Sequence, residues 1–355
     1  MNSSAVSVVI AFHNGSKWIE RALESVNAQT VKPAEIFVVD DGSASSESTF
    51  LKSLEREYGF RTLYQENAGQ SAARNLGVTE SSSEFVCLLD QDDYFLPDHI
   101  EKLLGIAQIK DPKFAFSYGD LHRIDESGKV LSDSSINIEA EHPHKDIQTM
   151  LATNMHILPS ATLIRRSAFI EVGGFDPELR GYEDDDLFLR LRLGGYTNTF
   201  TPDAVSAWTK NLSSTSFSEA MSESRFIYLQ KLLRQFPEGS LPGVNIFADL
   251  LHPRFGIHIA EDVIGSALGV SEEHSKRVGR LKEYLSLAAK DKSLGLKRKI
   301  SFAVLAIPLV GLPKKVLRAM LNLLLDSKLF SQSRGPKTIR GFVKKYSPRK
   351  EALRG

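Results

Sequence analysis

The segment 90–93, Asp-Gln-Asp-Asp, directly follows an apolar run, residues 85–89, that predicts a buried strand. Carboxylates this close together repel each other and raise each other's pKa unless a cation lies between them. A hard divalent ion such as Mg2+ or Mn2+ prefers oxygen ligands of this kind. When such an ion has few protein ligands, it usually binds phosphate oxygens as well. The segment therefore predicts a diphosphate-bearing substrate at the end of a strand.

Two other predicted strands also end in polar residues. Phe-His-Asn follows the run 6–11, and Asp-Asp-Gly-Ser follows the run 35–39. Apolar residues at helical spacing predict helices at 18–26, 48–58, 71–78 and 97–107, with a short strand at 61–64. Alternating strands and helices predict a parallel sheet covered on both faces. Ligands bind such sheets at the carboxyl ends of the strands, so we expect the three polar ends on one edge.

The middle of the chain is less regular. We expect strands at 114–121 and 160–164, a polar loop at 132–143, a turn at 173–177 and a helix at 183–193. That helix starts with four acidic residues. Helical patterns dominate from residue 218 onward.

The composition excludes several classes of protein. With 42% hydrophobic and 25% charged residues among 355, the chain is typical of a globular protein with more than one domain, not of a disordered or collagen-like one. The single cysteine, Cys87, excludes a disulfide within the chain and favours a reducing, cytoplasmic compartment. The first residues lack the features of a signal peptide, and no apolar stretch reaches about 18 residues, so we expect no transmembrane helix.

Six segments, in this order along the chain, resemble those of family 2 glycosyltransferases. They are Ser7-Val8-Val9-Ile10, Val38-Val39-Asp40-Asp41-Gly42-Ser43, Asn67 to Asn75, Leu88-Leu89-Asp90-Gln91-Asp92-Asp93, Gly173-Gly174-Phe175-Asp176 and Gly181 to Asp186. The resemblance covers residues 7–216. It implies an α/β GT-A fold, in which a Rossmann-like, mostly parallel sheet flanked by helices binds the nucleotide (1–110) beside an acceptor-binding half (111–215). It also implies inverting transfer of a sugar from a nucleotide diphosphate sugar, usually a UDP sugar.

The resemblance also implies a set of donor-binding residues. Asp41 matches the aspartate that accepts the N–H of uracil, and a carboxylate suits this role because only a donor satisfies it. The expected nucleotide-sugar-binding residues are Ala11, His13, Asn14, Asp41, Gly69, Arg74, Asn75, Asp90 and Gln91. His13 stands where the family often has an aromatic residue that stacks on the base. The alternatives are ordinary turn chemistry for Asp40 and Asp41, and a helix-surface position for Arg74.

The resemblance implies that Asp92 is the metal ligand of the family's DxD motif, with Asp90 on the ribose side. Mn2+ or Mg2+ there would stabilise charge on the departing diphosphate. For Asp93 we expect a cap on the following helix, and the alternative for the whole cluster is an acidic cap on a solvated loop. The family often supplies a histidine ligand after the last strand, but this chain has none there. Either Asn211 replaces it as a weaker oxygen ligand, or Lys210 offers a cation to the phosphates.

Four histidines in the middle of the chain are not at metal-ligand spacings, and we expect surface or acceptor-loop positions for them. They are His122, His142, His144 and His156.

Asp184 matches the family's catalytic base, the carboxylate that takes the proton of the acceptor hydroxyl. Glu183 would position the acceptor or support the base, and the transition state would be oxocarbenium-like. Acidic residues in a first helical turn also favour the helix dipole, and for Asp185 and Asp186 we expect only that role.

The region 216–355 is predicted to be helical and basic. From residue 290 to the end it contains 17 Lys and Arg but only 3 Asp and Glu. Apolar runs at 300–312 and 319–325, flanked by cations, suit an anionic membrane interface. The alternative is a helical subdomain with a solvated basic face. No nucleic-acid-binding motif accompanies the charge, so we expect no nucleic-acid partner.

The sequence thus predicts a cytoplasmic transferase at the inner face of the cell membrane, with a glycan or lipid-linked acceptor in surface polysaccharide synthesis. A catalytically inactive nucleotide-sugar-binding protein is the alternative, because the expected histidine is missing. A nucleotidyltransferase would need a Gly-rich phosphate loop, and the segment 11–16 has a single glycine.

Overall fold

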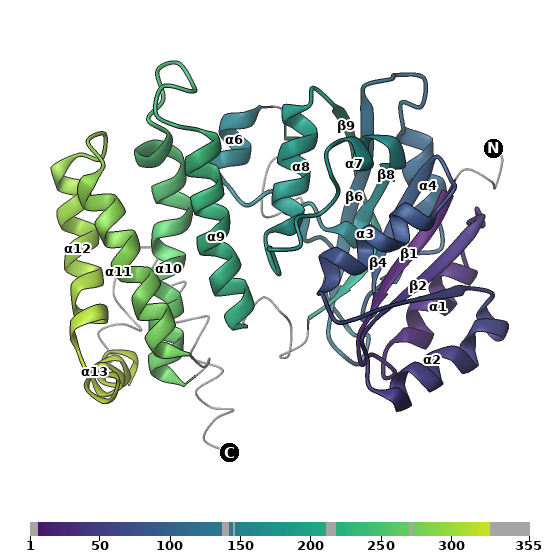
Figure 1. The fold of residues 1–355 in the computed structure, drawn as a ribbon, viewed down its shortest axis with the longest axis horizontal. Coiled ribbons are helices and arrows are strands. Elements are labelled where there is room, and N and C mark those ends of the chain that lie inside the picture. Colours follow the sequence, from purple (N-terminus) through teal and green to yellow (C-terminus); the bar gives the residue numbers. More distant parts are fainter. Residues whose placement is uncertain (1–5, 137–141, 145, 211–217, 270–272, 327–355) are drawn as a thin grey trace. The chain divides into compact units, whose positions relative to one another are not determined.

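The computed structural model describes residues 6–136, 142–144, 146–210, 218–269 and 273–326. The chain divides into two compact units, Met1–Ser214 and Thr215–Gly355. The first unit is built on a β-sheet flanked by helices, and the second is helical in its described part (Figure 1). No helix in the described ranges is long and apolar enough to cross a membrane. The division into nucleotide-binding and acceptor-binding halves stays a prediction.

The first half of the sheet is parallel, as the sequence predicts. In the order β3-β2-β1-β4, its strands are β1 (Val6–Phe12), β2 (Glu35–Asp41), β3 (Arg61–Gln65) and β4 (Phe85–Asp90). The helices between them are α1 (Ile19–Asn27), α2 (Ser45–Tyr58) and α3 (Gln70–Glu80). Strand β1 has β2 on one side and β4 on the other. It therefore marks the switch point at which open α/β sheets bind ligands.

The second half of the sheet is mixed. Beyond β4 follow β8 (Thr162–Arg165), β6 (Phe114–Ile124), β9 (Thr197–Thr209) and β5 (Tyr94–Phe95), with β7 (Val130–Ser132) paired to β6. The β6–β9 pair is parallel, and the other pairs in this half are antiparallel. The sequence pattern does not predict β9, because its threonines and Pro202 break any alternation of apolar residues.

The remaining described helices of the first unit are α4 (His99–Ile106), α6 (Ile147–Ala152), a 3-10 turn (Pro159–Ala161), α7 (Arg166–Glu171) and α8 (Glu183–Leu193). The bounds of α8 are those predicted from the sequence.

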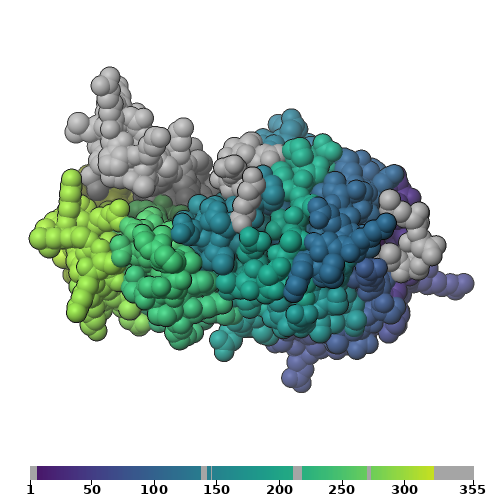
Figure 2. All heavy atoms as spheres, turned by 90° about the horizontal axis from the view of Figure 1, so that it is seen from above, coloured from purple at the N-terminus to yellow at the C-terminus, as the bar shows by residue number. Residues whose placement is uncertain are grey.

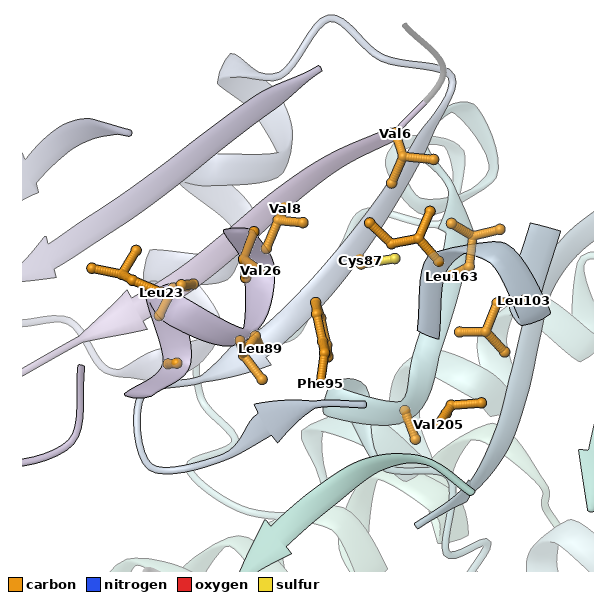
Figure 3. Packing of buried hydrophobic residues seen from close by; sticks show 14 of the residues in the cluster. Val6, Val8, Leu23, Val26, Cys87, Leu89, Phe95, Leu103, Leu163 and Val205 are labelled. Atoms are coloured by element: carbon orange, nitrogen blue, oxygen red, sulfur yellow. The ribbon is translucent and has the colours of Figure 1, made fainter. Parts of the chain in front are cut away.

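The main hydrophobic core lies between one face of the sheet and helices α1, α2 and α4. Successive side chains of a strand point to opposite faces, so alternate residues of β1 and β4, such as Val8 and Leu89, point into this core. Figure 3 shows Leu23 and Val26 of α1 and Leu103 of α4 among the same buried side chains. The core fixes β1 and β4 side by side and so positions the loops at their carboxyl ends.

Helix α3 packs on the opposite face of the sheet. A Cβ on Gly77 would lie 2.3 Å from a methyl carbon of Val9 and 3.2 Å from one of Val39. The helix reaches this close to β1 and β2 because residue 77 has no side chain. Arg74, one turn earlier on α3, is positioned by this contact.

The second unit contains the predicted helical C-terminal region. Its described elements are α9 (Glu219–Gln235), a π-helical turn (Ile246–Leu251), α10 (His252–Leu268), α11 (His274–Lys290), α12 (Leu296–Gly311) and α13 (Lys314–Asp326). Phe255 of α10 and Tyr284 of α11 are fully buried inside it. The buried Arg277 lies 3.0 Å from a carboxylate oxygen of Glu219, which joins α11 to α9.

Candidate active site

Gln91 joins the ends of β1 and β4. Its side-chain oxygen accepts from the N–H of His13 (2.9 Å), and its side-chain nitrogen donates to the carbonyl of His13 (3.2 Å). A Cβ on Gly15 would lie 2.1 Å from the amide end of Gln91, so a larger residue at position 15 would displace that amide. Ala11 lies at the same edge, paired in register with Asp90. Four of the predicted donor-binding residues therefore meet at the switch point.

His13 and Asn14 join β1 to β2. Nδ1 of His13 lies 2.9 Å from the carbonyl oxygen of Asp41, and Nε2 lies 2.9 Å from the side-chain nitrogen of Asn14. Because the carbonyl of Asp41 can only accept, a proton on Nδ1 would satisfy that contact and leave Nε2 as an acceptor for Asn14. Asn14 also accepts from the N–H of Ala44 (2.9 Å) and donates to the hydroxyl of Ser43 (3.0 Å). His13 is exposed, and both nitrogens of its imidazole have hydrogen-bond partners.

Asp41 is buried and holds the loop between β3 and α3. Oδ1 accepts from Gln65 and from the N–H of Ala68 (2.7 Å each), and Oδ2 accepts from the N–H of Gly69 (2.8 Å). Among the described residues Oδ2 accepts only this bond, and a carboxylate oxygen can accept two. The predicted contact with uracil stays a prediction. Asp40 accepts from the N–H of Ser43 in the turn after β2 (2.9 Å) and from the hydroxyl of Ser48 in α2, in line with its structural alternative.

Arg74 is buried at the centre of the site, so the helix-surface alternative is wrong. Its side chain is 2% exposed and lies between Asp90, at the end of β4, and Glu183, at the start of α8. Nη2 donates to Asp90, and Nη1 lies 3.0 Å from Oε1 of Glu183. Burial alone would lower the pKa of the guanidinium, but the two carboxylates raise it above its ordinary value. One cation thus links the loop after β4 to the acidic start of α8.

The three aspartates of segment 90–93 have different surroundings. Asp90 is 33% exposed at its side chain. The carbonyl of Asp92 accepts from Arg21 (2.6 Å) and from the hydroxyl of Thr209. Asp93 is buried and accepts from the N–H of Thr209 (2.9 Å). The prediction that Asp93 caps the following helix is therefore wrong, because its carboxylate attaches the loop to β9 instead.

Burial, and then the charges of Asp92 and Asp90, raise the pKa of Asp93 well above its ordinary value. This repulsion marks a concentration of negative charge that a cation would relieve. In the described part of the chain, no three His, Cys, Asp or Glu side chains form a group that could hold a metal ion. Binding of Mn2+ or Mg2+ at Asp92, with phosphate oxygens as further ligands, stays a prediction. Asn211, the second predicted ligand, lies outside the described residues.

Glu183 and Asp184 begin α8 in different environments. Glu183 is 5% exposed and accepts from Gln70 (2.6 Å) and Arg74 (3.0 Å). Burial raises the pKa of Glu183, and Arg74 opposes this. Asp184 is partly exposed, and within the described ranges its carboxylate accepts only from the N–H of Asp185 (2.8 Å). Burial and the neighbouring carboxylates raise the pKa of Asp184 well above its ordinary value, which suits a proton acceptor.

Asp185 and Asp186 do more than favour the helix dipole, so that expectation is wrong. Asp185 accepts from the N–H of Met155 (3.1 Å). Asp186 pairs with Arg190 one turn later (2.7 Å), and Arg190 in turn donates to the carbonyl of Gly174 (2.6 Å). These bonds attach α8 to the segments around it and fix where Asp184 lies.

The side chain of Asn75, in α3, bonds to the turn at 173–177. Its side-chain nitrogen donates to the carbonyl of Phe175, and its side-chain oxygen accepts from the N–H of Phe175, both at 2.8 Å. Both polar groups of the amide are used in this way. The predicted contact of Asn75 with the nucleotide stays a prediction.

Several supporting residues were not predicted from the sequence. They are Arg21, Gln70, Ser160 and Thr209. Each bonds to a site residue 70 to 116 positions away, so no local pattern marks it. Of the four histidines expected at surface or acceptor-loop positions, His144 is buried, with Nε2 2.8 Å from the carbonyl of Met155.

A family model described as glycosyl transferase family 2 matches residues 7–173. The uncharacterised glycosyltransferase YwdF of Bacillus subtilis (strain 168) is 30% identical over 247 residues, which cover 69% of this chain and 89% of YwdF. An uncharacterised glycosyltransferase of Rickettsia conorii is 28% identical over 235 residues, which cover 60% of this chain. The match spans only 37% of the Rickettsia protein's own length.

Two solved structures share the fold. The crystal structure of Staphylococcus aureus TarS 1-349 in complex with UDP-GlcNAc has a TM-score of 0.56 at 17% identity, covering 90% of this chain and 92% of that one. The mannosyltransferase PcManGT from Pyrobaculum calidifontis, in complex with GDP-Man and Mn2+, has a TM-score of 0.51 at 16% identity, covering 90% and 84%. At these identities the likeness concerns the fold alone.

Proposed function

The chain belongs to glycosyltransferase family 2 and has the GT-A fold, and we propose that it transfers a sugar from a nucleotide diphosphate sugar to an acceptor hydroxyl with inversion. The preferred donor is a UDP sugar, and the acceptor is a glycan or a lipid-linked glycan in surface polysaccharide synthesis. The observation that carries the proposal is Arg74, which joins the acidic loop after β4 to the helix that bears Asp184. The groups proposed for donor activation and for proton removal therefore belong to two segments that Arg74 joins.

The donor half of the proposal rests on the edge formed by β1, β2 and β4. The remaining acceptor position on Asp41 suits the N–H of uracil, and the exposed ring of His13 can stack on the base. The diphosphate would lie at the acidic loop, where Asp92 would hold the metal and Lys210 or Asn211 would add a further contact. When bound, Mn2+ or Mg2+ would stabilise the charge that develops on the leaving diphosphate.

Asp184 is the proposed general base. The acceptor oxygen forms a bond to the anomeric carbon as the bond from that carbon to the diphosphate oxygen breaks, and the hydroxyl proton passes to the carboxylate of Asp184. Attack from the face opposite the leaving group inverts the anomeric centre. Glu183, held by Arg74 and Gln70, fixes the first turn of α8 and so the direction of the neighbouring carboxylate.

The substitution Asp184→Asn tests this assignment. It should lower the transfer rate by about 100-fold or more, the typical contribution of a general base, while calorimetry shows unchanged UDP binding in the presence of Mn2+. The control is Glu178→Gln, an exposed carboxylate shortly before α8, which should keep the wild-type rate. Near wild-type transfer by Asp184→Asn would refute the assignment.

The donor is found by measuring slow hydrolysis of UDP, GDP and dTDP sugars with Mg2+ or Mn2+. The panel includes both UDP and GDP sugars because the two solved structures that share the fold contain UDP-GlcNAc and GDP-Man. Binding of a nucleotide sugar without hydrolysis or transfer by the wild-type chain would favour the inactive binding protein instead.

A further inference from the structure

The exposed side of α12 is apolar. Its four large side chains, which we call the α12 stripe, are Leu296, Ile300, Val304 and Ile307, exposed by 73%, 53%, 69% and 59%. At about 100° of rotation per residue they fall within an arc of roughly 80°, so they form one line along the helix. The other side of α12 packs within the second unit through the buried Ala306 and Leu309. Both sides of this helix are therefore apolar, and only one is covered.

Helix α13 repeats the pattern. Val316 and Leu323, seven residues apart and so on one face, are 51% and 74% exposed. In the described ranges twelve large hydrophobic side chains are exposed, and half of them belong to α12 and α13. Figure 2 shows the segment at the yellow end of the colour scale, which includes α12 and α13, at the surface in that view. An apolar surface concentrated in this way marks an interaction site.

The charge of the same segment limits what can cover it. Residues 296–323 contain six Lys and Arg and no Asp or Glu. Lys297, Lys314 and Lys315 are exposed. A second copy of this surface would bring like charges together. The chain's own segment 327–355 is no better suited, because it contains nine Lys and Arg and one acidic residue. A partner with an anionic surface and an apolar interior matches both the positive charge and the exposed apolar side chains of this segment.

We propose that α12 and α13 dock on the surface of an anionic lipid bilayer. The α12 stripe enters the boundary between headgroups and acyl chains, and the exposed lysines contact the headgroup phosphates. With 16 residues α12 lies in the interface rather than spanning it. The proposal does not depend on the transfer reaction, since it rests only on residues of the second unit.

Co-sedimentation of the full chain with vesicles tests the proposal. The wild type should bind vesicles of equal parts phosphatidylcholine and phosphatidylglycerol, and bind phosphatidylcholine alone at least about tenfold more weakly. The variant Ile300→Gln/Val304→Gln/Ile307→Gln should lose about tenfold or more in partitioning. Its matched control, Ile109→Gln/Leu131→Gln/Ile170→Gln, removes three exposed apolar side chains from the first unit and should bind like the wild type.

The charge part is tested with Lys297→Gln/Lys314→Gln/Lys315→Gln. This variant should lose binding to the anionic vesicles about tenfold. The control Lys32→Gln/Lys110→Gln/Lys129→Gln removes the same charge from exposed lysines of the first unit and should have no effect. Equal loss in both variants would mean that net charge alone attracts the chain, which would overturn the proposal.

A second measurement does not depend on multiple substitutions. Cys87 is buried, so a cysteine introduced as Val304→Cys can be labelled selectively with an environment-sensitive fluorophore. Its emission should shift to the blue on addition of anionic vesicles, whereas a label at Leu131→Cys should not respond. An unresponsive Val304 label would overturn the proposal. So would sedimentation velocity showing that the α12 stripe variant abolishes self-association but leaves vesicle binding unchanged.

Discussion

Replacing Arg74 with methionine removes the cation that joins the two halves of the site while keeping an unbranched apolar side chain. In the wild type, Arg74 bonds to Glu183, whose side chain is 7% exposed, and to Asp90, whose side chain is 33% exposed. The substitution leaves Glu183 buried without its cation. Asp90 has access to water, which screens its charge, so losing the ion pair between Arg74 and Asp90 costs less.

The expected cost follows from this difference in burial. Breaking a buried ion pair by removing one partner costs about 3–5 kcal/mol, because the other charge stays buried without compensation. The Asp90 pair adds at most about 1 kcal/mol, as expected for a partly exposed pair. Domains have free energies of unfolding of about 5–15 kcal/mol, so Arg74→Met should leave the first unit only marginally stable.

The loss should depend on pH. Burial raises the pKa of Glu183 above its ordinary value of 4.5, and Arg74 opposes this. Without Arg74 the pKa of folded Glu183 rises further above the unfolded value, so the folded state binds more protons and its stability falls as the pH rises through that interval. The difference between Arg74→Met and wild type should therefore be larger at pH 8 than at pH 5.

Urea unfolding at the two pH values measures this effect. Both tryptophans of the chain, Trp18 and Trp208, belong to the first unit, so their fluorescence reports on the unit that contains Arg74. The double variant Arg74→Met/Glu183→Gln should regain about 1 kcal/mol or more over Arg74→Met and lose most of the added pH dependence. A loss below about 1 kcal/mol for Arg74→Met at pH 8, or an equal loss at both pH values, would refute this account.

Three further predictions concern packing, protonation and metal. Gly77→Ala should lower the free energy of unfolding, measured with urea, by about 1–3 kcal/mol, because its Cβ would lie 2.3 Å from the stiff side chain of Val9. The control is Gly105→Ala, whose Cβ would have open space around it. Equal effects of the two substitutions would contradict the packing argument. The transfer rate should rise with pH as Asp184 loses its proton. Because the pKa of Asp184 is raised, this rise should occur above pH 3.8, the ordinary pKa of an aspartate. A transfer rate that no longer changes above pH 3.8 would exclude Asp184 as the base. EDTA should abolish transfer and Mn2+ should restore it, with Asp92→Asn needing more Mn2+ than wild type; activity unchanged in EDTA would remove the metal from the proposal.

Part of this site follows from local sequence. Strands β1, β2 and β4 each end in polar residues, and the rule that parallel strands share an edge is enough to bring them together. The bonds between Gln91 and His13 are the observed consequence. Helix α8 was predictable to the residue, because an acidic first turn precedes an apolar run and Gly194 follows its end.

Other features depend on contacts between distant segments. Asp93 resembles a helix cap in sequence, yet its partner is the N–H of Thr209, 116 residues away on a strand that no alternating pattern reveals. Arg74 likewise resembles a helix-surface residue until the fold brings Asp90 and Glu183 to either side of it. A sequence pattern reports the period of one element, and it carries no information about which side chain of another element will face it.

The acidic start of α8 shows how the fold separates equivalent-looking residues. Four consecutive carboxylates at one helix N-terminus all benefit from the helix dipole, so the dipole cannot distinguish them. Three of them have partners from other segments or the next turn: Glu183 with Arg74, Asp185 with the N–H of Met155 and Asp186 with Arg190. Within the described ranges Asp184 accepts only from the N–H of Asp185, and burial, followed by the charges of Glu183 and Asp185, raises its pKa. This difference is the reason for proposing Asp184, rather than one of its three neighbours, as the carboxylate that takes the proton.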